Sequence, residues 1–211
     1  MPTQDYKLKS GQRVSGVTTI IGSNLGWNTR PLMYWAWNEG REGRDYRDTS
    51  KAACESGTIT HALIEAELKG RIYEYPKDTT KEVLQKAATA YQAWLEWREL
   101  VGFELLHSEL SLVSEEYEFG GTIDIAAIKK VPAIVDIKTS SGVYADHKIQ
   151  IAAYGQLYNE HYPDNPIRAY YLLQLGKNDG AFAYHYWPEL NNAWEAFKCC
   201  LQLHGLKKKI K

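Results

Sequence analysis

The sequence predicts an α/β protein in which a central mixed β-sheet is flanked by helices and preceded by a helical N-terminal region. Residues 120–138 contain two runs rich in β-branched side chains on either side of Lys129–Pro132, which is typical of paired strands. Residues 81–101 repeat apolar side chains at helical spacing before Gly102, which indicates a long helix with a defined end. The expected order of elements is helices, three strands, a helix, two strands and a last helix.

The length and composition are those of one globular domain. At 211 residues the chain can bury a substantial core. We divide the domain into a cap region over residues 1–55, a core over residues 56–190, and a C-terminal helix with a basic tail over residues 191–211. The net charge of −1 does not indicate nucleic-acid binding, and it does not exclude it, because basic residues can be confined to one groove.

Cysteine content and hydropathy further narrow the class of protein. The three cysteines, Cys54, Cys199 and Cys200, form no CxxC motif, which argues against a disulfide framework and against zinc or iron–sulfur sites. The sequence shows no basic-then-apolar leader and no apolar run near the ~20 residues that cross a bilayer. We therefore expect a cytoplasmic protein without a membrane partner.

The cap region has weaker signals than the rest of the chain. Residues 1–13 are polar and fit a frayed end or a short edge element, whereas residues 14–22 fit either a strand or the first turn of a helix. The next helix is expected to have Thr29 as its N-cap and Pro31 in its first turn. The charged, glycine-containing residues 39–50 are interpreted as a solvated helix end and loop.

The core elements have clearer boundaries. Ser56 and Gly57 are expected to open a helix over residues 58–69, which Gly70 ends because glycine readily adopts the left-handed conformation that follows a helix. The later elements follow from the same signals and are a strand at residues 103–113, a helix at about 144–162, strands at 167–175 and 180–187, and a helix at 191–203.

Three ionisable residues interrupt the two apolar strands within residues 120–138. Asp124 lies between two isoleucines on the first strand, and Asp136 and Lys138 share one face of the second, because side chains alternate along a strand. Charges on half-buried strands are costly unless they are paired or bind a metal. The two carboxylates could converge on a hard cation such as Mg²⁺ or Mn²⁺. The alternative is a structural Asp–Lys pair at a sheet edge.

Two helical pairs could add to such a site. His61 and Glu65 are four residues apart and therefore face the same side of their helix, as do Gln150 and Tyr154 on a later helix. The alternatives are a histidine with a purely structural role and a polar patch on an amphipathic helix.

The order and spacing of these residues resemble the PD-(D/E)XK nuclease superfamily and, more narrowly, its RecB-type exonuclease branch, which includes small stand-alone phage and mitochondrial nucleases. The resemblance covers roughly residues 55–160 and implies a restriction-endonuclease-like core. The matching positions are a glycine–aspartate pair, an Asp-x-Lys strand, two helical motifs and an acidic strand residue: Gly121 and Asp124, Asp136 to Lys138, Gln150 and Tyr154, Gly57 and His61, and Glu109.

The resemblance implies a role for each residue of the central motif. Asp124, Asp136 and His61 would bind the metal, with the backbone carbonyl of Ile137 as a further ligand. Lys138 would orient or deprotonate the attacking water and contact the phosphate.

The surrounding residues receive supporting roles from the same resemblance. Gln150 would position the catalytic lysine or the substrate phosphate, and Tyr154 would contact the DNA backbone. Glu65 could be a partner that supports His61 or a plain surface acid, and Glu109 could be a metal-associated acid or an ordinary carboxylate at the end of a strand. Three further polar residues are candidates for contacts with substrate phosphates: Thr139, Ser140 and Lys148.

The function that the resemblance implies is a Mg²⁺- or Mn²⁺-dependent deoxyribonuclease, most simply an exonuclease on single-stranded DNA or DNA ends in replication, recombination or repair. A helicase, a single-strand-binding protein or a recombinase would be a suitable partner, because the chain has no Walker A motif of its own. The expected location is a bacterial cytoplasm, phage-infected or not, ahead of the mitochondrial matrix.

Two other functions stay open at the level of sequence. These are a non-catalytic nucleic-acid-binding or assembly module on the same fold and a structure-specific endonuclease. The chain lacks the four cysteines that iron–sulfur members of the branch need. Trp27, Trp35 and Trp37 could stack on bases or simply pack, and the basic tail from Lys207 to Lys211 could bind phosphates or be solvated.

Overall fold

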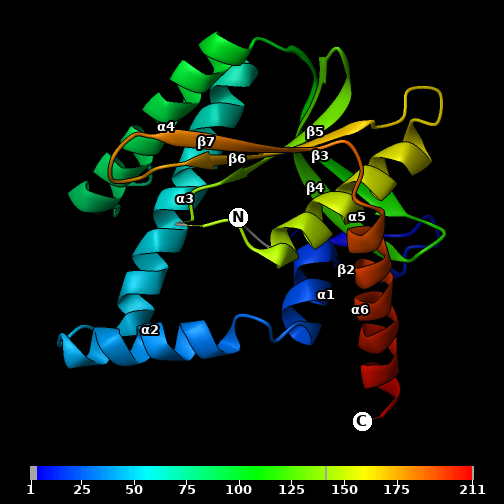
Figure 1. The fold of residues 1–211 in the computed structure, drawn as a ribbon, viewed down its shortest axis with the longest axis horizontal. Coiled ribbons are helices and arrows are strands. Elements are labelled where there is room, and N and C mark those ends of the chain that lie inside the picture. Colours follow the sequence, from blue (N-terminus) through cyan, green and yellow to red (C-terminus); the bar gives the residue numbers. More distant parts are fainter. Residues whose placement is uncertain (1–3, 141, 211) are drawn as a thin grey trace.

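The computed structural model describes residues 4–140 and 142–210 (Figure 1). Its strands, in chain order, are β1 (Tyr6–Lys7), β2 (Arg13–Gly16), β3 (Glu104–Ser114), β4 (Phe119–Lys129), β5 (Val131–Lys138), β6 (Ala169–Leu175) and β7 (Phe182–Trp187). Its helices are α1 (Val17–Asn24), α2 (Thr29–Arg41), α3 (Tyr46–Leu68), α4 (Lys81–Val101), α5 (Ala145–His161) and α6 (Asn191–Lys209).

The strands form one mixed sheet in the order β1-β2-β4-β5-β6-β7, with β3 paired along the remaining edge of β4. The pairs β3–β4, β4–β5 and β6–β7 are antiparallel, whereas β2–β4 and β5–β6 are parallel. Helix α5 joins β5 to β6, as a crossover between parallel strands requires. The predicted mixed sheet with flanking helices is confirmed.

Helices cover both faces of the sheet (Figure 1). On one face, α3 and α4 pack onto β4–β6, with Trp94 and Trp97 of α4 buried against Val135 and its neighbours. On the other face, α1, α5 and α6 form a second core that includes Ile151 and Phe197. Strands buried on both sides are nearly continuous apolar runs, so charged residues within them stand out in the sequence.

The edge of β4 that faces β5 is shared by two strands. β2 pairs with residues 119–120 at one end, and β5 pairs with residues 125–129 at the other. Residues 121–124 lie between these two contacts. This is where β5 diverges from β4 and where side chains, rather than a neighbouring strand, occupy the edge.

The N-terminal elements resolve the ambiguities of the sequence. Residues 14–22 contain both of the expected alternatives, since β2 ends at Gly16 and α1 begins at once. Asn28, not Thr29, is the N-cap residue of α2, so that prediction was wrong by one position. Gly70 and Gly102 follow α3 and α4 with φ of 62° and 57°, as predicted for glycines that end helices.

Helix α3 begins earlier than predicted. It starts at Tyr46 rather than after Gly57, and the Asp45 carboxylate caps it by accepting a hydrogen bond of 2.8 Å from the backbone N–H of Arg47. Gly57 therefore lies inside the helix, where glycine costs about 1 kcal/mol relative to alanine. The earlier start was missed because Asp45 lies in a charged, glycine-containing run that resembles a loop.

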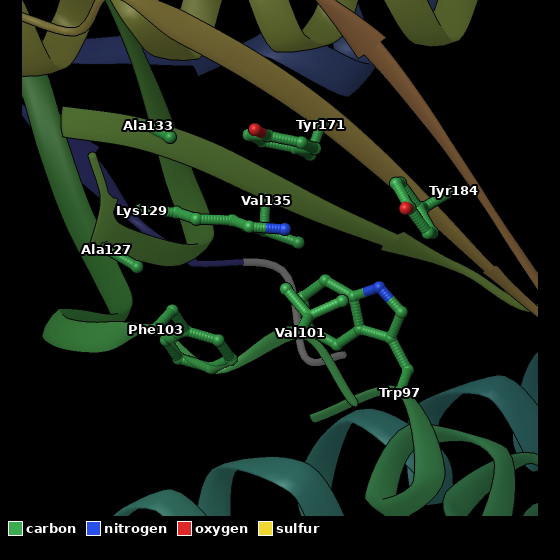
Figure 2. A pocket seen from close by; sticks show the side chains of 9 residues that line it. All are labelled: Trp97, Val101, Phe103, Ala127, Lys129, Ala133, Val135, Tyr171 and Tyr184. Atoms are coloured by element: carbon green, nitrogen blue, oxygen red, sulfur yellow. The ribbon is translucent and has the colours of Figure 1, made fainter. Parts of the chain in front are cut away.

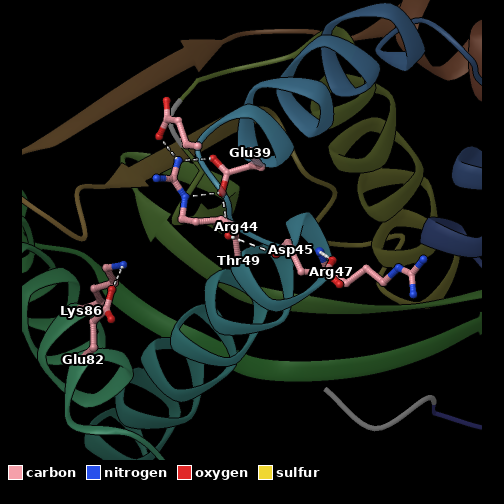
Figure 3. Close-up of polar contacts among 8 residues, drawn as sticks. Glu39, Arg44, Asp45, Arg47, Thr49, Glu82 and Lys86 are labelled. Atoms are coloured by element: carbon pink, nitrogen blue, oxygen red, sulfur yellow. Dashed lines mark hydrogen bonds and ion pairs between the residues drawn. The ribbon is translucent and has the colours of Figure 1, made fainter.

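The predicted solvated loop at residues 39–50 instead contains an ion pair between the buried Glu39 and the exposed Arg44 (Figure 3). Glu39 is only 6% exposed, and its carboxylate accepts two hydrogen bonds of 2.8 Å from Arg44 and one of 2.8 Å from Thr49. Arg44 and Thr49 lower the pKa of Glu39 to about 2. This ion pair joins the end of α2 to the start of α3.

Replacing Arg44 with alanine is expected to loosen the α2–α3 corner. The substitution removes two of the three hydrogen bonds that the buried Glu39 carboxylate accepts. A buried charge with too few hydrogen-bond partners destabilises the folded state, so local unfolding between α2 and α3 should become more frequent. We expect faster chymotrypsin cleavage at the tyrosine and tryptophan residues of α2. Arg47→Ala is the matched control, because the Arg47 guanidinium lies over the Tyr46 ring at the same corner. Equal cleavage rates for the two variants would contradict this role of the ion pair.

Helix α6 is longer than predicted and includes most of the basic tail. It extends to Lys209, and Lys207 Nζ lies 3.4 Å from the backbone carbonyl of Ser23 in α1. One turn earlier, the His204 ring nitrogen lies 2.9 Å from the Ser15 hydroxyl. These two contacts hold α6 against β2 and α1. Lys211 lies outside the described residues, and phosphate binding by the tail stays a prediction.

One recess beside the sheet is too small for a ligand. It lies between the end of α4 and strands β4–β7 and has a volume of about 10 Å³, no more than one water requires (Figure 2). Its walls are mostly apolar, with Trp97, Phe103 and Tyr171 among them. None of the helices within residues 4–140 and 142–210 combines the length and apolar character needed to span a membrane.

Candidate active site

A cleft of about 870 Å³ lies at the divergence of β4 and β5. Its walls come from the N-terminal residues, α1, α3, β3–β5 and α5, so segments far apart in the sequence meet there. Most of the predicted site residues line it: His61, Glu65, Glu109, Asp124, Lys138, Gln150 and Tyr154. Asp136 is fully buried and lies beneath Lys138.

Three of these residues form a cluster suited to a divalent cation. His61 Nδ1 lies 3.5 Å from Asp124 Oδ1 and 3.9 Å from Glu109 Oε1, and one ligand atom from each residue falls within 4.8 Å of the others. His61 Nδ1 is buried, and no hydrogen-bond partner for it is found in the described part of the chain. Two carboxylates and one imidazole suit ions such as Mg²⁺ and Mn²⁺. These residues therefore fit the implied metal.

A local distortion of the sheet brings the two carboxylates together. Glu109 on β3 has a φ of +49°, which is rare for a residue other than glycine. Asp124 lies opposite it on β4, between the pairs Leu110–Ile123 and Ser108–Ile125. Ile123 packs into the core beneath α5, whereas Ile125 packs into the core beneath α4. Because residues two apart on a regular strand point to the same face, the alternation of side chains along β4 breaks at Asp124. Such conformations concentrate at functional sites.

The second carboxylate oxygen of Asp124 bonds to β5 at the point where β5 separates from β4. Asp124 Oδ2 accepts a hydrogen bond of 2.7 Å from the backbone N–H of Ile137 on β5. The side chain thus takes the place of a ladder bond where the two strands separate. This contact fixes the orientation of the carboxylate, while the predicted metal-ligand role of the Ile137 carbonyl stays a prediction.

Asp136 lies with Lys138 rather than with the histidine cluster. Lys138 Nζ is 2.7 Å from Asp136 Oδ2, and Gln150 Nε2 is 3.4 Å from Asp136 Oδ1. Burial raises the pKa of Asp136 to about 6, and the Asp124 charge adds to this, although Lys138 opposes it. Gln150 also donates to the Tyr154 hydroxyl at 2.9 Å, so it links Asp136 to Tyr154.

The charges of the cluster favour a protonated histidine while no cation is bound. Burial would lower the pKa of His61, but Asp124 and Glu109 outweigh burial and raise it to about 10. Burial would raise the pKa of Asp124, yet His61 and Lys138 lower it. The positive charge of the protonated imidazole therefore offsets the two carboxylates while no cation is bound.

Cation binding is expected to release this proton. His61 must be neutral to act as a ligand, so Mn²⁺ binding at neutral pH should release close to one proton from its imidazole. Apparent affinity should rise by up to about tenfold per pH unit below the pKa of His61. Titration calorimetry in two buffers of different ionisation enthalpy measures the release. The His61→Gln variant should lose it, and a heat of binding that is independent of the buffer would contradict the prediction.

Of the remaining predicted residues, Glu65 lines the cleft, whereas Thr139, Ser140 and Lys148 do not. Glu65 forms an ion pair of 2.5 Å with Lys69. Ser140 donates to the Gly142 carbonyl at 2.9 Å, and Lys148 Nζ lies 5.0 Å from the centre of the Trp187 ring. The phosphate contacts predicted for Thr139, Ser140 and Lys148 stay predictions.

The polar N-terminal wall of the cleft was missed by sequence reasoning. The Tyr6 hydroxyl lies 2.9 Å from Thr122 Oγ1, which also lies 2.9 Å from Ser111 Oγ and donates to Gln4 Oε1 at 2.8 Å. Ser111 and Thr122 lie two residues from the acids of the cluster, so strand periodicity could have placed them there. No sequence signal would bring residues 4–6 to this position.

Two motif glycines provide close approach between elements. A Cβ atom at Gly121 would lie 2.8 Å from the Tyr154 ring and 2.9 Å from Leu157 of α5. A Cβ atom at Gly57 would lie 3.0 Å from Thr139 Oγ1, directly after Lys138. These glycines set how closely α5 and α3 approach the strands that carry the acids.

Gly121→Ala is expected to push α5 away from β4 and to displace Tyr154. Overpacking of this kind typically costs about 1–3 kcal/mol, which chemical denaturation would measure, and any activity that depends on the cleft should fall as well. Gly205→Ala on α6 is the control, because nothing lies within 4 Å of a Cβ atom there. An unchanged stability and activity of Gly121→Ala would show that this close approach is dispensable.

Comparison with known proteins identifies the family. The chain belongs to the PD-(D/E)XK nuclease superfamily, which it matches over residues 35–198. Similar solved structures include an alkaline exonuclease (LHK-Exo) from Laribacter hongkongensis, at 13% identity and a TM-score of 0.37, covering 73% of this chain and 84% of that one. LHK-Exo in complex with dAMP has 13% identity, a TM-score of 0.32 and the same coverage. The crystal structure of SSO0001 has 13% identity and a TM-score of 0.34, covering 69% of this chain and 74% of that one. No curated protein matches the sequence.

Proposed function

We propose that the protein is a Mg²⁺- or Mn²⁺-dependent deoxyribonuclease of the RecB-type branch that hydrolyses phosphodiester bonds, most simply as an exonuclease on single-stranded DNA or DNA ends. The observation that carries this proposal is the His61–Glu109–Asp124 cluster, which opens into the same cleft as Lys138. A non-catalytic module on this fold would need neither the positive backbone φ of Glu109 nor a lysine held beside the buried Asp136.

The residues of the cleft take distinct roles in this proposal. His61, Glu109 and Asp124 would hold the cation. The metal-ligand role that the motif resemblance implies for Asp136 stays a prediction. When bound, the cation supplies positive charge to the scissile phosphate and acidifies water beside it. Tyr154 lies in the same cleft and would contact the DNA backbone.

Lys138 would orient the attacking water and stabilise charge on the phosphate. Burial would lower the pKa of Lys138, but the carboxylates of Asp136 and Asp124 outweigh burial and raise it. A lysine held in its charged form suits a donor to water and phosphate better than a base. Asp136 therefore acts on the reaction through Lys138, whose ammonium it holds at 2.7 Å.

The cellular role that we propose is DNA processing in replication, recombination or repair in the cytoplasm. Exonuclease action on single strands would call for a helicase, a single-strand-binding protein or a recombinase as partner, because the sequence contains no Walker A motif for unwinding. These assignments rest on the resemblance of the motifs.

The test is degradation of single-stranded and duplex DNA labelled separately at each end, with Mg²⁺, Mn²⁺ or EDTA. We expect cleavage that requires the cation and is lost in Lys138→Ala, and the product ladders will reveal polarity and exonuclease or endonuclease action. Binding without cleavage of any single-stranded, duplex or flapped DNA would overturn the enzymatic proposal in favour of a binding module.

A further inference from the structure

Helix α2 carries a continuous exposed stripe of arginines and large side chains on one face. Its members recur at spacings of three, four, seven and eleven residues, which share a helical face, and they are Arg30, Met33, Tyr34, Trp37 and Arg41. Met33, Tyr34 and Trp37 are 67%, 64% and 54% exposed. We call these five residues the α2 stripe.

The aromatic and cationic groups of the α2 stripe are already in contact with one another. The Tyr34 and Trp37 ring centroids are 5.7 Å apart with an interplanar angle of 34°, and the Arg41 guanidinium carbon lies 4.7 Å from the centre of the Trp37 ring. Trp35 differs, since it is half-buried and packs edge-on against Tyr46. The stripe therefore presents an ordered row of rings and a cation.

The charge of the α2 stripe has one sign. Both residues of the stripe that carry charge at neutral pH are arginines, and the single acid within α2, Glu39, points away from it and is buried under Arg44. A row of exposed rings flanked by cations is complementary to a single strand, whose bases stack on rings while its phosphates meet the cations.

The position of α2 relates the stripe to the catalytic cleft. Figure 1 shows α2 lying across the start of α3, away from the sheet, and Asn28 contacts Asp146 of α5 at 3.4 Å. From Tyr46 to His61 along α3 is about 22 Å at 1.5 Å per residue. A stacked strand at ~3.4 Å per nucleotide would cover this distance with about six nucleotides.

We propose that the α2 stripe is a second binding site for single-stranded DNA, which holds the strand at a distance from the bond cleaved in the cleft. This inference rests on the proposed function and adds to it a requirement for strand length. A second copy of the chain is a poorer occupant. A two-fold contact between two stripes would bring their like-charged arginines together.

Fluorescence anisotropy in EDTA, which prevents cleavage, tests the stripe. The probes are labelled oligothymidylates of about 30 and about four nucleotides, only the longer of which reaches both sites. We expect the Tyr34→Ala, Trp37→Ala variant to bind the longer strand at least about tenfold more weakly, as the loss of base stacking implies, and to lose most of the preference of the unaltered protein for the longer strand over the shorter one. Leu32→Ala is the control, since Leu32 is 58% exposed on the opposite side of α2. Hydrolysis of a nitrophenyl ester of thymidine phosphate should be equal in all three proteins.

The outcomes separate the stripe from the proposed function. Unchanged affinity of the double variant for the longer strand, with the unaltered protein still degrading DNA, would overturn the stripe and leave the nuclease proposal intact. Weakened binding without metal-dependent degradation by the unaltered protein would support the stripe and refute the nuclease proposal. An unaltered protein that sediments as a dimer, with a monomeric double variant of unchanged DNA affinity, would assign the stripe to a subunit interface and overturn the proposal.

Discussion

Replacing Asp124 with asparagine is expected to reduce metal-dependent DNA cleavage on the order of 10³-fold, because a bound cation contributes several kcal/mol and each ~1.4 kcal/mol changes a rate tenfold. The carboxylate has two roles, as its Oδ1 faces His61 and its Oδ2 accepts the Ile137 N–H. An asparagine oxygen can keep the hydrogen bond to Ile137, so the fold should persist. What is lost is the negative charge that lies closest to His61.

Two measurements separate loss of the cation from loss of structure. Mn²⁺ affinity should fall together with activity, while the circular dichroism spectrum stays that of the unaltered protein. Glu65→Gln is the matched control, because Glu65 lines the same cleft but is neutralised by Lys69. We expect this control to retain most of its activity and Mn²⁺ affinity. An Asp124→Asn variant that binds Mn²⁺ and cleaves DNA normally would exclude Asp124 from the metal site.

Lys138→Ala is expected to lower the cleavage rate by about 10²–10⁴-fold, the range for loss of a group that positions or transfers a proton. It should also change how stability depends on pH. Asp136 has a pKa raised to about 6 in the folded protein, so the stability that its protonated form contributes is present below its unfolded pKa and is lost as pH rises through about 6. Removing Lys138 takes away the charge that opposes this shift. The variant should therefore lose more stability than the unaltered protein between pH 5 and pH 8, which urea denaturation at each pH will measure.

The double variant Lys138→Ala, Asp136→Asn distinguishes the two effects of Lys138. Its stability should fall less with pH in this range than that of Lys138→Ala, because the buried carboxylate is gone and only the fall that comes from the raised pKa of His61 is left. Its activity should stay as low as that of Lys138→Ala. Recovery of activity in the double variant would mean that Lys138 serves only to neutralise Asp136.

The local geometry of the strands accounts for what the sequence predicted well. Asp136 and Lys138 alternate with apolar residues over a short run, so their common face follows from the strand period alone. The ends of α3 and α4 follow from Gly70 and Gly102, whose left-handed conformations are a property of glycine itself. These features depend on neighbours in the chain and need no knowledge of the fold.

The start of α3 and the burial of Glu39 depend on contacts that sequence patterns do not reveal. Residues 39–50 read as a solvated loop because charges alternate with glycine, yet Arg44 folds back onto Glu39 and makes its burial tolerable. The same holds for residues 4–6, which reach the cleft only because β1 pairs with β2.

The sequence by itself determined the family, the strands that carry the acids and the residues that could perform the chemistry, because these lie in short motifs with local periodicity. Only the tertiary structure decided which of these residues lie together. Glu109 joins His61 and Asp124, whereas Asp136 is held by Lys138. The physical reason is that β5 diverges from β4 at Asp124, opposite the positive φ of Glu109. This divergence depends on how β2, β3 and β5 share the two edges of one strand, and no motif within a single strand encodes it.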